Sequence, residues 1–142
     1  MSHTLSLQDQ LDIQYLLARA GAALDKHAMD ELGALFTDNA SFSLRIAGGD
    51  LVGPFEGRGA IVDMMSAAVA MQTDQRRHMI SNVFFGSHSP DGAMEVTSSL
   101  TLLATEGGVI QLLSAGVYHD RVVHTDAGWL LLSRHLELDT PY

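Results

Sequence analysis

The spacing of apolar side chains changes halfway along the chain, from a helical period to strict alternation, and this change constrains the fold more than any other feature. Residues 78–86, 93–104, 109–124 and 129–138 alternate apolar and polar side chains, and the turn sequences SHSPDG, TEGG and TDAG separate them. Alternation with a period of two is typical of a β-strand that buries one face. Short turns that contain glycine join strands that are neighbours in the sequence. We therefore expect the second half of the chain to be a long antiparallel meander.

The first half has the period of α-helices instead. Ser6, followed three residues later by Asp9, resembles a capping box. Apolar side chains then recur at helical spacing as far as the sequence LDKH; they are Ile13, Leu16, Leu17, Ala20 and Leu24. Two further helices are expected, one over residues 29–36 and one over residues 59–72.

Two short strand-like segments lie between these helices. Residues 40–46 alternate like a half-buried strand, and the sequence AGGD after them indicates a hairpin turn. The sequence LVGPFEG predicts a short strand at an edge of the sheet, because Gly53 and Pro54 weaken its pairing. Helices followed by a meander predict a single α+β domain over residues 1–142. A strongly bent sheet around the helices is expected to enclose one cavity for a ligand.

The charge of the chain argues against two classes of partner. Its net charge is −9, with one lysine and seven arginines. No basic patch supplies the phosphate contacts that nucleic-acid binding needs, and the acidity disfavours docking on anionic membranes. No apolar run approaches the roughly 20 residues that cross a bilayer, and the N-terminus lacks the features of a signal peptide. We therefore expect a cytoplasmic protein that binds neither nucleic acid nor membrane.

The sequence RRHMISNVFF places a titratable side chain at the start of a strand. His78 is in phase with Ile80, Asn82 and Phe84, so an imidazole and an amide are expected to share a face with two large apolar side chains. Either His78 is a core residue whose hydrogen bonds are satisfied, or this face lines a pocket in which a proton moves. An aspartate partner would make the imidazole an effective general base.

Four segments, in this order and with this spacing, resemble the SnoaL-like branch of the nuclear-transport-factor-two-like superfamily. They are LDKHAMDELGALFTDNASF, FEGRGAIVDMM, RRHMISNV and AGVYHDRVVHTDAGWLLLSRHLELD, and the resemblance covers residues 6–139. The resemblance implies a cone-shaped α+β barrel, in which three N-terminal helices pack on a strongly curved, mostly antiparallel sheet.

The resemblance also implies a reaction. The branch includes cofactor-free dehydratases and lyases, in which an aspartate at the end of the first helix pairs with a histidine that opens the strand after the third helix. Those positions are Asp25 and His78 in this chain. We therefore expect an enzyme without a cofactor that takes a proton from a small hydrophobic, cyclic or aromatic molecule. Dehydration or another elimination is ranked ahead of isomerisation and cyclisation. The dehydratases carry a tyrosine five residues before the aspartate, where this chain has Ala20.

Four further residues are candidates for the wall of the pocket. Asn82 would hold a ligand oxygen or form a hydrogen bond between strands. Tyr118 either donates to a ligand oxygen inside the sheet or is a strand tyrosine with its hydroxyl at the rim. Met64 and Phe84 would supply apolar surface. The histidines lack the spacing of metal ligands, so no metal is expected.

A non-catalytic role stays open at this point. The small (beta) subunits of ring-hydroxylating dioxygenases belong to the same branch and carry an aspartate and an RH…SN stretch at similar places. Asp25 and His78 would then be structural residues of such a subunit or of a ligand-binding module. Isomerases and polyketide cyclases are further alternatives on the same fold. Arg134, in phase with Leu132 and Leu136, is expected to form a salt bridge.

The outer face of the long sheet is expected to be apolar and to carry Leu113, Val117 and Leu131. An apolar face of this size is typical of a contact surface between proteins. The chain is therefore expected to form a homodimer or a homotrimer.

Overall fold

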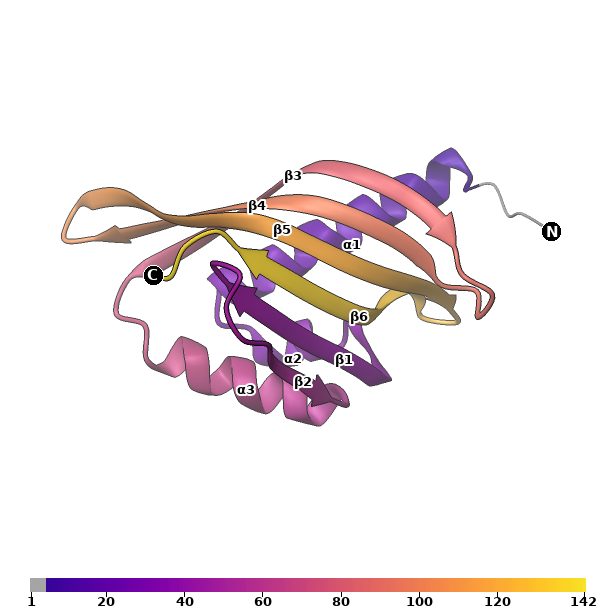
Figure 1. Cartoon of the computed structure of the whole chain (residues 1–142), viewed down its shortest axis with the longest axis horizontal. Helices are drawn as coiled ribbons and strands as arrows, with labels where there is room; N and C mark the ends of the chain where they lie inside the picture. Colours follow the sequence, from indigo (N-terminus) through magenta and orange to yellow (C-terminus); the bar gives the residue numbers. More distant parts are fainter. Residues whose placement is uncertain (1–4) are drawn as a thin grey trace.

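The structure, a computed structural model, describes residues 5–142; residues 1–4, where part of a signal peptide would lie, are outside the described residues. Its elements in chain order are α1 (Leu7–Asp25), α2 (Met29–Gly33), β1 (Phe36–Ile46), β2 (Val52–Glu56), α3 (Arg58–Ala70), β3 (Gln75–His88), β4 (Met94–Glu106), β5 (Val109–Thr125) and β6 (Gly128–Leu138). The strands form one sheet in the order β2-β1-β6-β5-β4-β3, antiparallel except between β1 and β6. The sheet curves but stays open (Figure 1). The α+β prediction is confirmed, and the predicted barrel is an open, curved sheet.

Helix α1 begins as the sequence predicts. Ser6 Oγ accepts the backbone N–H of Asp9 at 3.0 Å, and the Ser6 N–H donates to Asp9 Oδ2 at 3.3 Å. These two bonds complete the capping box. The helix lies behind β4 and β5 in Figure 1 and packs mainly on β3. Its inward face is buried, as predicted, through Ile13, Leu16, Leu17, Ala20 and Leu24.

Helices α2 and α3 pack at the β1 end of the sheet. Helix α3 contacts β1, β2 and α2, and its Ile61 is 0% exposed. Helix α2 ends at Gly33 rather than at residue 36, because Phe36 already pairs with Leu131 of β6. The Leu131 N–H also donates to the Leu35 carbonyl at 2.8 Å. Pairing with a distant strand therefore outweighs the local helical period.

A β-bulge in β3 overturns the predicted phase of that strand. The register with β4 shifts between Ser81 and Phe84, and Asn82 adopts a left-handed backbone with φ of 50°. An extra residue in one strand turns every later side chain to the opposite face. Val83 and Phe85 therefore pack against the core, whereas Phe84 is 68% exposed. The prediction that Asn82 and Phe84 share the inner face with His78 is wrong.

A second irregularity corrects the predicted outer face. The register between β5 and β6 shifts between Arg121, which pairs with Ser133, and Val122, which pairs with Leu131. Leu131 consequently points inward and is 0% exposed. Across β1, β6 and β5 the outer face instead carries a polar row of Ser43, His135 and His119. The prediction that Leu131 lies on an apolar outer face is wrong.

Candidate active site

A glycine brings the end of α1 against β3. A Cβ atom on Gly21 would lie 3.3 Å from the His78 carbonyl oxygen and 3.4 Å from the His78 Cβ. Contacts this short leave no room for a side chain, so Gly21 sets how closely the helix approaches the strand. One turn later the helix ends at Asp25. The position of Asp25 beside His78 therefore follows from the packing of α1.

Asp25 and His78 are joined by three hydrogen bonds. His78 Nδ1 lies 2.7 Å from Asp25 Oδ1, and the His78 backbone N–H donates to Oδ1 at 3.0 Å and to Oδ2 at 3.2 Å. The exposed fractions of the two side chains are 14% for His78 and 12% for Asp25. The structure therefore brings together the two residues that the resemblance pairs, at a site to which solvent has little access.

The pairing determines which imidazole nitrogen is free to react. An ionised carboxylate only accepts hydrogen bonds, so Nδ1 carries the proton and donates it to Asp25. Nε2 then holds a lone pair, and no other residue among 5–142 forms a hydrogen bond to it. A carboxylate in this position would also stabilise an imidazolium, if Nε2 took a proton. The arrangement is that of a general base with an orienting carboxylate.

Gln75 holds the two elements of this site together. Its Nε2 donates to the Asp25 carbonyl at 2.9 Å and to the Arg76 carbonyl at 2.8 Å, so it joins the end of α1 to the start of β3. Arg76 in turn bonds Asp74 at 2.7 Å and lies 5.0 Å from the ring centroid of Tyr142. Nothing in the sequence distinguishes Gln75, because an exposed glutamine gives no periodic signal.

Tyr118 lies inside the sheet rather than at its rim. It is 3% exposed, and the guanidinium carbon of Arg134 is 3.8 Å from its ring centroid. Burial raises the pKa of Tyr118 to about 12, with the negative charges of Asp120 and Asp25 acting in the same direction. The phenol therefore keeps its proton at any physiological pH and is available as a hydrogen-bond donor. No other described residue accepts a hydrogen bond from it.

Arg134 has the salt bridge that its position predicts. Its Nε and Nη2 donate to the two carboxylate oxygens of Asp120 at 2.8 and 2.9 Å. The side chains are 3% and 0% exposed, so the pair is fully desolvated. Attraction to Asp120 raises the pKa of Arg134, although burial acts against it. The bidentate pair neutralises its own charge and packs against the ring of Tyr118.

The structure also reveals a buried polar group, the hydroxyl of Ser98, that sequence reasoning missed. Ser98, which pairs with Tyr118 across β4 and β5, is 2% exposed. Its Oγ is buried without a hydrogen-bond partner among residues 5–142. A buried unpaired hydroxyl is unusual unless a ligand or a water completes it. Its signal in the sequence is a serine in phase with Val96 and Leu100.

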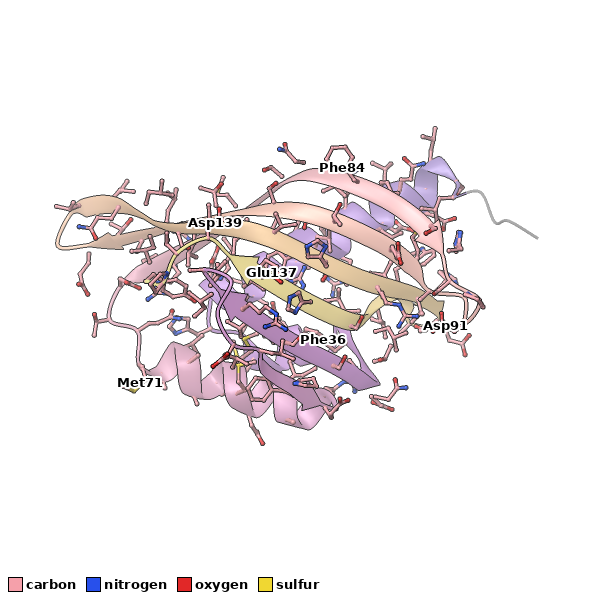
Figure 2. The ribbon with its side chains drawn as sticks, in the orientation of Figure 1. Phe36, Met71, Phe84, Asp91, Glu137 and Asp139 are labelled. Atoms are coloured by element: carbon pink, nitrogen blue, oxygen red, sulfur yellow. The ribbon has the colours of Figure 1, made fainter. Side chains whose placement is uncertain are left out.

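The remaining predicted pocket residues fall into two groups. Met64 on α3 is partly buried and packs against the core, and its role as apolar wall stays a prediction. Phe84 lies at the β3 edge of the sheet (Figure 2), and both it and Asn82 are exposed. The bulge at Asn82 removes these two from the face of His78, so their predicted place in the pocket is wrong.

Residues 5–142 contain no group of three or more histidine, aspartate or glutamate side chains that could hold a metal ion. None of the described helices is both long enough and apolar enough to cross a membrane.

Solved structures with the same fold come from several bacteria. Aln2 from a Streptomyces species has a TM-score of 0.80 at 22% identity, over 96% of this chain and 95% of that one. A protein described as the beta subunit of a putative aromatic-ring-hydroxylating dioxygenase, from Novosphingobium aromaticivorans, has a TM-score of 0.80 at 21% identity, over 94% and 90%. A Catenulispora acidiphila protein in complex with S-DNPA has a TM-score of 0.80 at 26% identity, over 94% and 96%.

The family is shown by the sequence itself. Comparison with curated proteins finds no match. Residues 5–135, however, match the family model of the SnoaL-like domain. This match spans every helix and strand of the chain except the end of β6. The chain therefore belongs to the SnoaL-like domain family.

Proposed function

We propose that this chain is a cofactor-independent enzyme in which His78, oriented by Asp25, removes a proton from a small hydrophobic, cyclic or aromatic substrate. One observation carries the proposal. The 2.7 Å contact between Asp25 and His78 Nδ1 leaves the lone pair of His78 Nε2 without a hydrogen-bond partner among the described residues, so Nε2 can act as the base. A positioned base of this kind contributes about 10²–10⁴-fold to a rate. That contribution suits a C–H bond that is already acidic, such as one beside a carbonyl group.

The proposed reaction is an elimination. Nε2 of His78 takes the proton, the C–H electrons move into the adjacent carbonyl, and the enolate expels a hydroxide or another leaving group from the next carbon. The imidazolium then returns its proton to the leaving group, so the base is regenerated. Asp25 stabilises the imidazolium while it exists. Isomerisation and cyclisation share the first step and are the alternatives for what the enolate does next.

The core side of the sheet, on which His78 lies, favours an apolar substrate with one polar group. Ile80 and Met64 are partly buried and pack against the core near the helices, and Arg134 is already neutralised by Asp120. The phenol of Tyr118 and the unpaired hydroxyl of Ser98 offer hydrogen bonds to a substrate oxygen. The binding of S-DNPA by a protein of the same fold supports a small organic molecule as ligand.

The proposal is tested by proton exchange. The bicyclic ketone 2-tetralone has an acidic C–H beside its carbonyl, and its exchange for deuterium in D₂O is followed by NMR. Exchange above the buffer rate is expected with the wild type and a loss of at least about 100-fold with His78→Ala. His124→Ala is the matched control, because His124 is an exposed imidazole that contacts Trp129 at 5.2 Å between ring centroids.

A second candidate function is a non-catalytic subunit. The resemblance to the dioxygenase beta subunit, at a TM-score of 0.80, favours it. Asp25 would then serve to fix β3 to α1 through the His78 backbone N–H. In that case the wild type gives no exchange, and Asp25→Asn and His78→Ala both lower the free energy of unfolding by several kcal/mol. The cytoplasmic location stays a prediction.

A further inference from the structure

Three polar side chains form a hydrogen-bonded chain on the outer face of the sheet. Ser43 Oγ lies 2.7 Å from His135 Nδ1, and His135 Nε2 lies 2.8 Å from Glu137 Oε1. Ser43 pairs with His135 across β1 and β6, and Glu137 follows two residues later on the same face of β6. Figure 2 shows Glu137 on the side of β6 that faces away from α1. This cluster is therefore on the opposite face from Asp25 and His78.

The carboxylate of Glu137 determines which nitrogen of His135 carries the proton. Ionised Glu137 only accepts hydrogen bonds, so His135 Nε2 carries the proton and donates it. Nδ1 then has the lone pair, and the Ser43 hydroxyl donates to it. A serine whose hydroxyl points at an imidazole, with the imidazole oriented by a carboxylate, is the arrangement that activates an oxygen nucleophile.

The cluster is open to small molecules. The exposed fractions of the His135 and Glu137 side chains are 27% and 40%. A groove of about 370 Å³ is lined by His135, and its other polar walls are Glu95, Thr97, His119, Asp120, Arg121 and Ser133. Ser43 is not a wall of this groove and adjoins it through its contact with His135. Arg45 pairs with Glu137 across β1 and β6, and its guanidinium donates to the Gly49 carbonyl at 3.0 Å. A planar ester placed in the groove would therefore lie beside the His135 ring.

We propose that Ser43 is the nucleophile of a second site, which accepts acyl groups from small activated esters. Ser43 Oγ forms a bond to the ester carbonyl carbon while its proton passes to His135 Nδ1. The bond to the alkoxy or aryloxy group then breaks, and the leaving oxygen takes the proton from His135. Water then attacks the acyl carbon while His135 takes a proton from the water. The bond to Ser43 Oγ breaks, Oγ takes the proton back from His135, and a carboxylic acid is released.

The site is expected to acylate faster than it turns over. Glu137 only accepts hydrogen bonds, and Arg45 Nη1 donates to the Gly49 carbonyl at 3.0 Å, so neither residue supplies a preorganised donor for an oxyanion at Ser43. Loss of one oxyanion-hole donor from an enzyme costs about 10²–10³ in rate. The expected behaviour is therefore a burst close to one equivalent of alcohol or phenol, followed by slow release of the acid.

The experiment uses p-nitrophenyl acetate with the full chain. The wild type is expected to release a burst of p-nitrophenolate and to carry an acetyl group on Ser43, located by peptide mass mapping. Ser43→Ala should lower the burst rate by at least tenfold. Ser41→Ala is the matched control, because Ser41 lies two residues earlier on the same face of β1 and has no imidazole partner among the described residues.

Two results would overturn the proposal. One is an acetyl group mapped to a residue other than Ser43 in the wild type, a measurement that does not depend on whether any variant folds. The other is a burst in Ser43→Ala equal to that in Ser41→Ala. Glu137→Gln provides a further check, because loss of the carboxylate removes the group that orients His135, and the burst rate should fall while circular dichroism stays unchanged.

Discussion

Asp25 accepts hydrogen bonds from both the ring and the backbone of His78, at 2.7, 3.0 and 3.2 Å, although 53 residues separate the two in the chain. The carboxylate thus fixes the start of β3 and the tautomer of its first inward side chain together. Substitution of Asp25 is therefore expected to affect both stability and chemistry.

Gly21 is expected to control the approach of α1 to His78. A Cβ added at Gly21 meets the His78 carbonyl oxygen at 3.3 Å, so Gly21→Ala should force the helix outward and lower stability by about 1–3 kcal/mol. Thermal unfolding followed by circular dichroism measures the change. Gly59→Ala is the matched control, since a Cβ there meets nothing within 4 Å. Equal losses of stability in the two variants would show that the close packing of Gly21 against His78 does not contribute to stability.

The buried Arg134–Asp120 pair is expected to be essential for stability. Asp120→Ala leaves a guanidinium uncompensated in a site where Arg134 is 3% exposed, and loss of one partner of a buried pair costs about 3–5 kcal/mol. Lys26→Ala breaks an ion pair whose side chains are 59% and 64% exposed, and should change stability by less than about 1 kcal/mol. Urea denaturation compares the variants. A small loss in Asp120→Ala would contradict the desolvated pair.

Tyr118 is expected to make stability fall at high pH. Burial raises its pKa to about 12 in the folded state, whereas an unfolded tyrosine titrates near 10. Between these values the unfolded chain loses a proton that the folded chain keeps, so stability decreases as pH rises, by roughly 3 kcal/mol across the whole window. Tyr118→Phe should remove this decrease. In the wild type, ultraviolet titration should find one phenol that ionises well above the range of a free tyrosine.

Association between copies is expected at the β4–β5 hairpin. The sequence predicts a dimer or trimer contact on an apolar outer face. In the structure three of the exposed large apolar side chains lie together at the start of β5, with Val109 57%, Ile110 69% and Leu112 67% exposed. This hairpin projects beyond the rest of the sheet in Figure 1. Ile110→Ser together with Leu112→Ser should convert the oligomer to a monomer in light scattering. A wild-type protein that is monomeric at micromolar concentration would contradict this prediction.

The sequence predicts features that recur periodically along a helix or strand, and features that mark the end of a helix. The capping box at Ser6, the inward face of α1 and the meander all follow from local period, and the Asp25–His78 pair follows from the resemblance. The alternating pattern wrongly places Asn82 and Phe84 on the inner face. One extra residue in β3 reverses the face of the side chains that follow it, and the alternation before that residue does not reveal it. Leu131 is misplaced for the same reason.

The outer cluster has no signal in the sequence either. Ser43 and His135 are 92 residues apart and meet because β1 and β6 pair in parallel, the one such pair in the described sheet. Parallel pairing between distant strands has no local signature in the sequence. The register of the pairing, rather than the type of either residue, creates the contact.

The central claim is that Asp25 and His78 act as one base. The most direct measurement is the deuterium exchange of 2-tetralone with the wild type, His78→Ala, Asp25→Asn and the double variant, each checked for folding by circular dichroism. The account predicts that both single variants lose most of the exchange and that the double variant is little worse than His78→Ala, because residues that act as a unit are not additive. Wild-type exchange at the buffer rate, or unchanged exchange in folded His78→Ala, would contradict it.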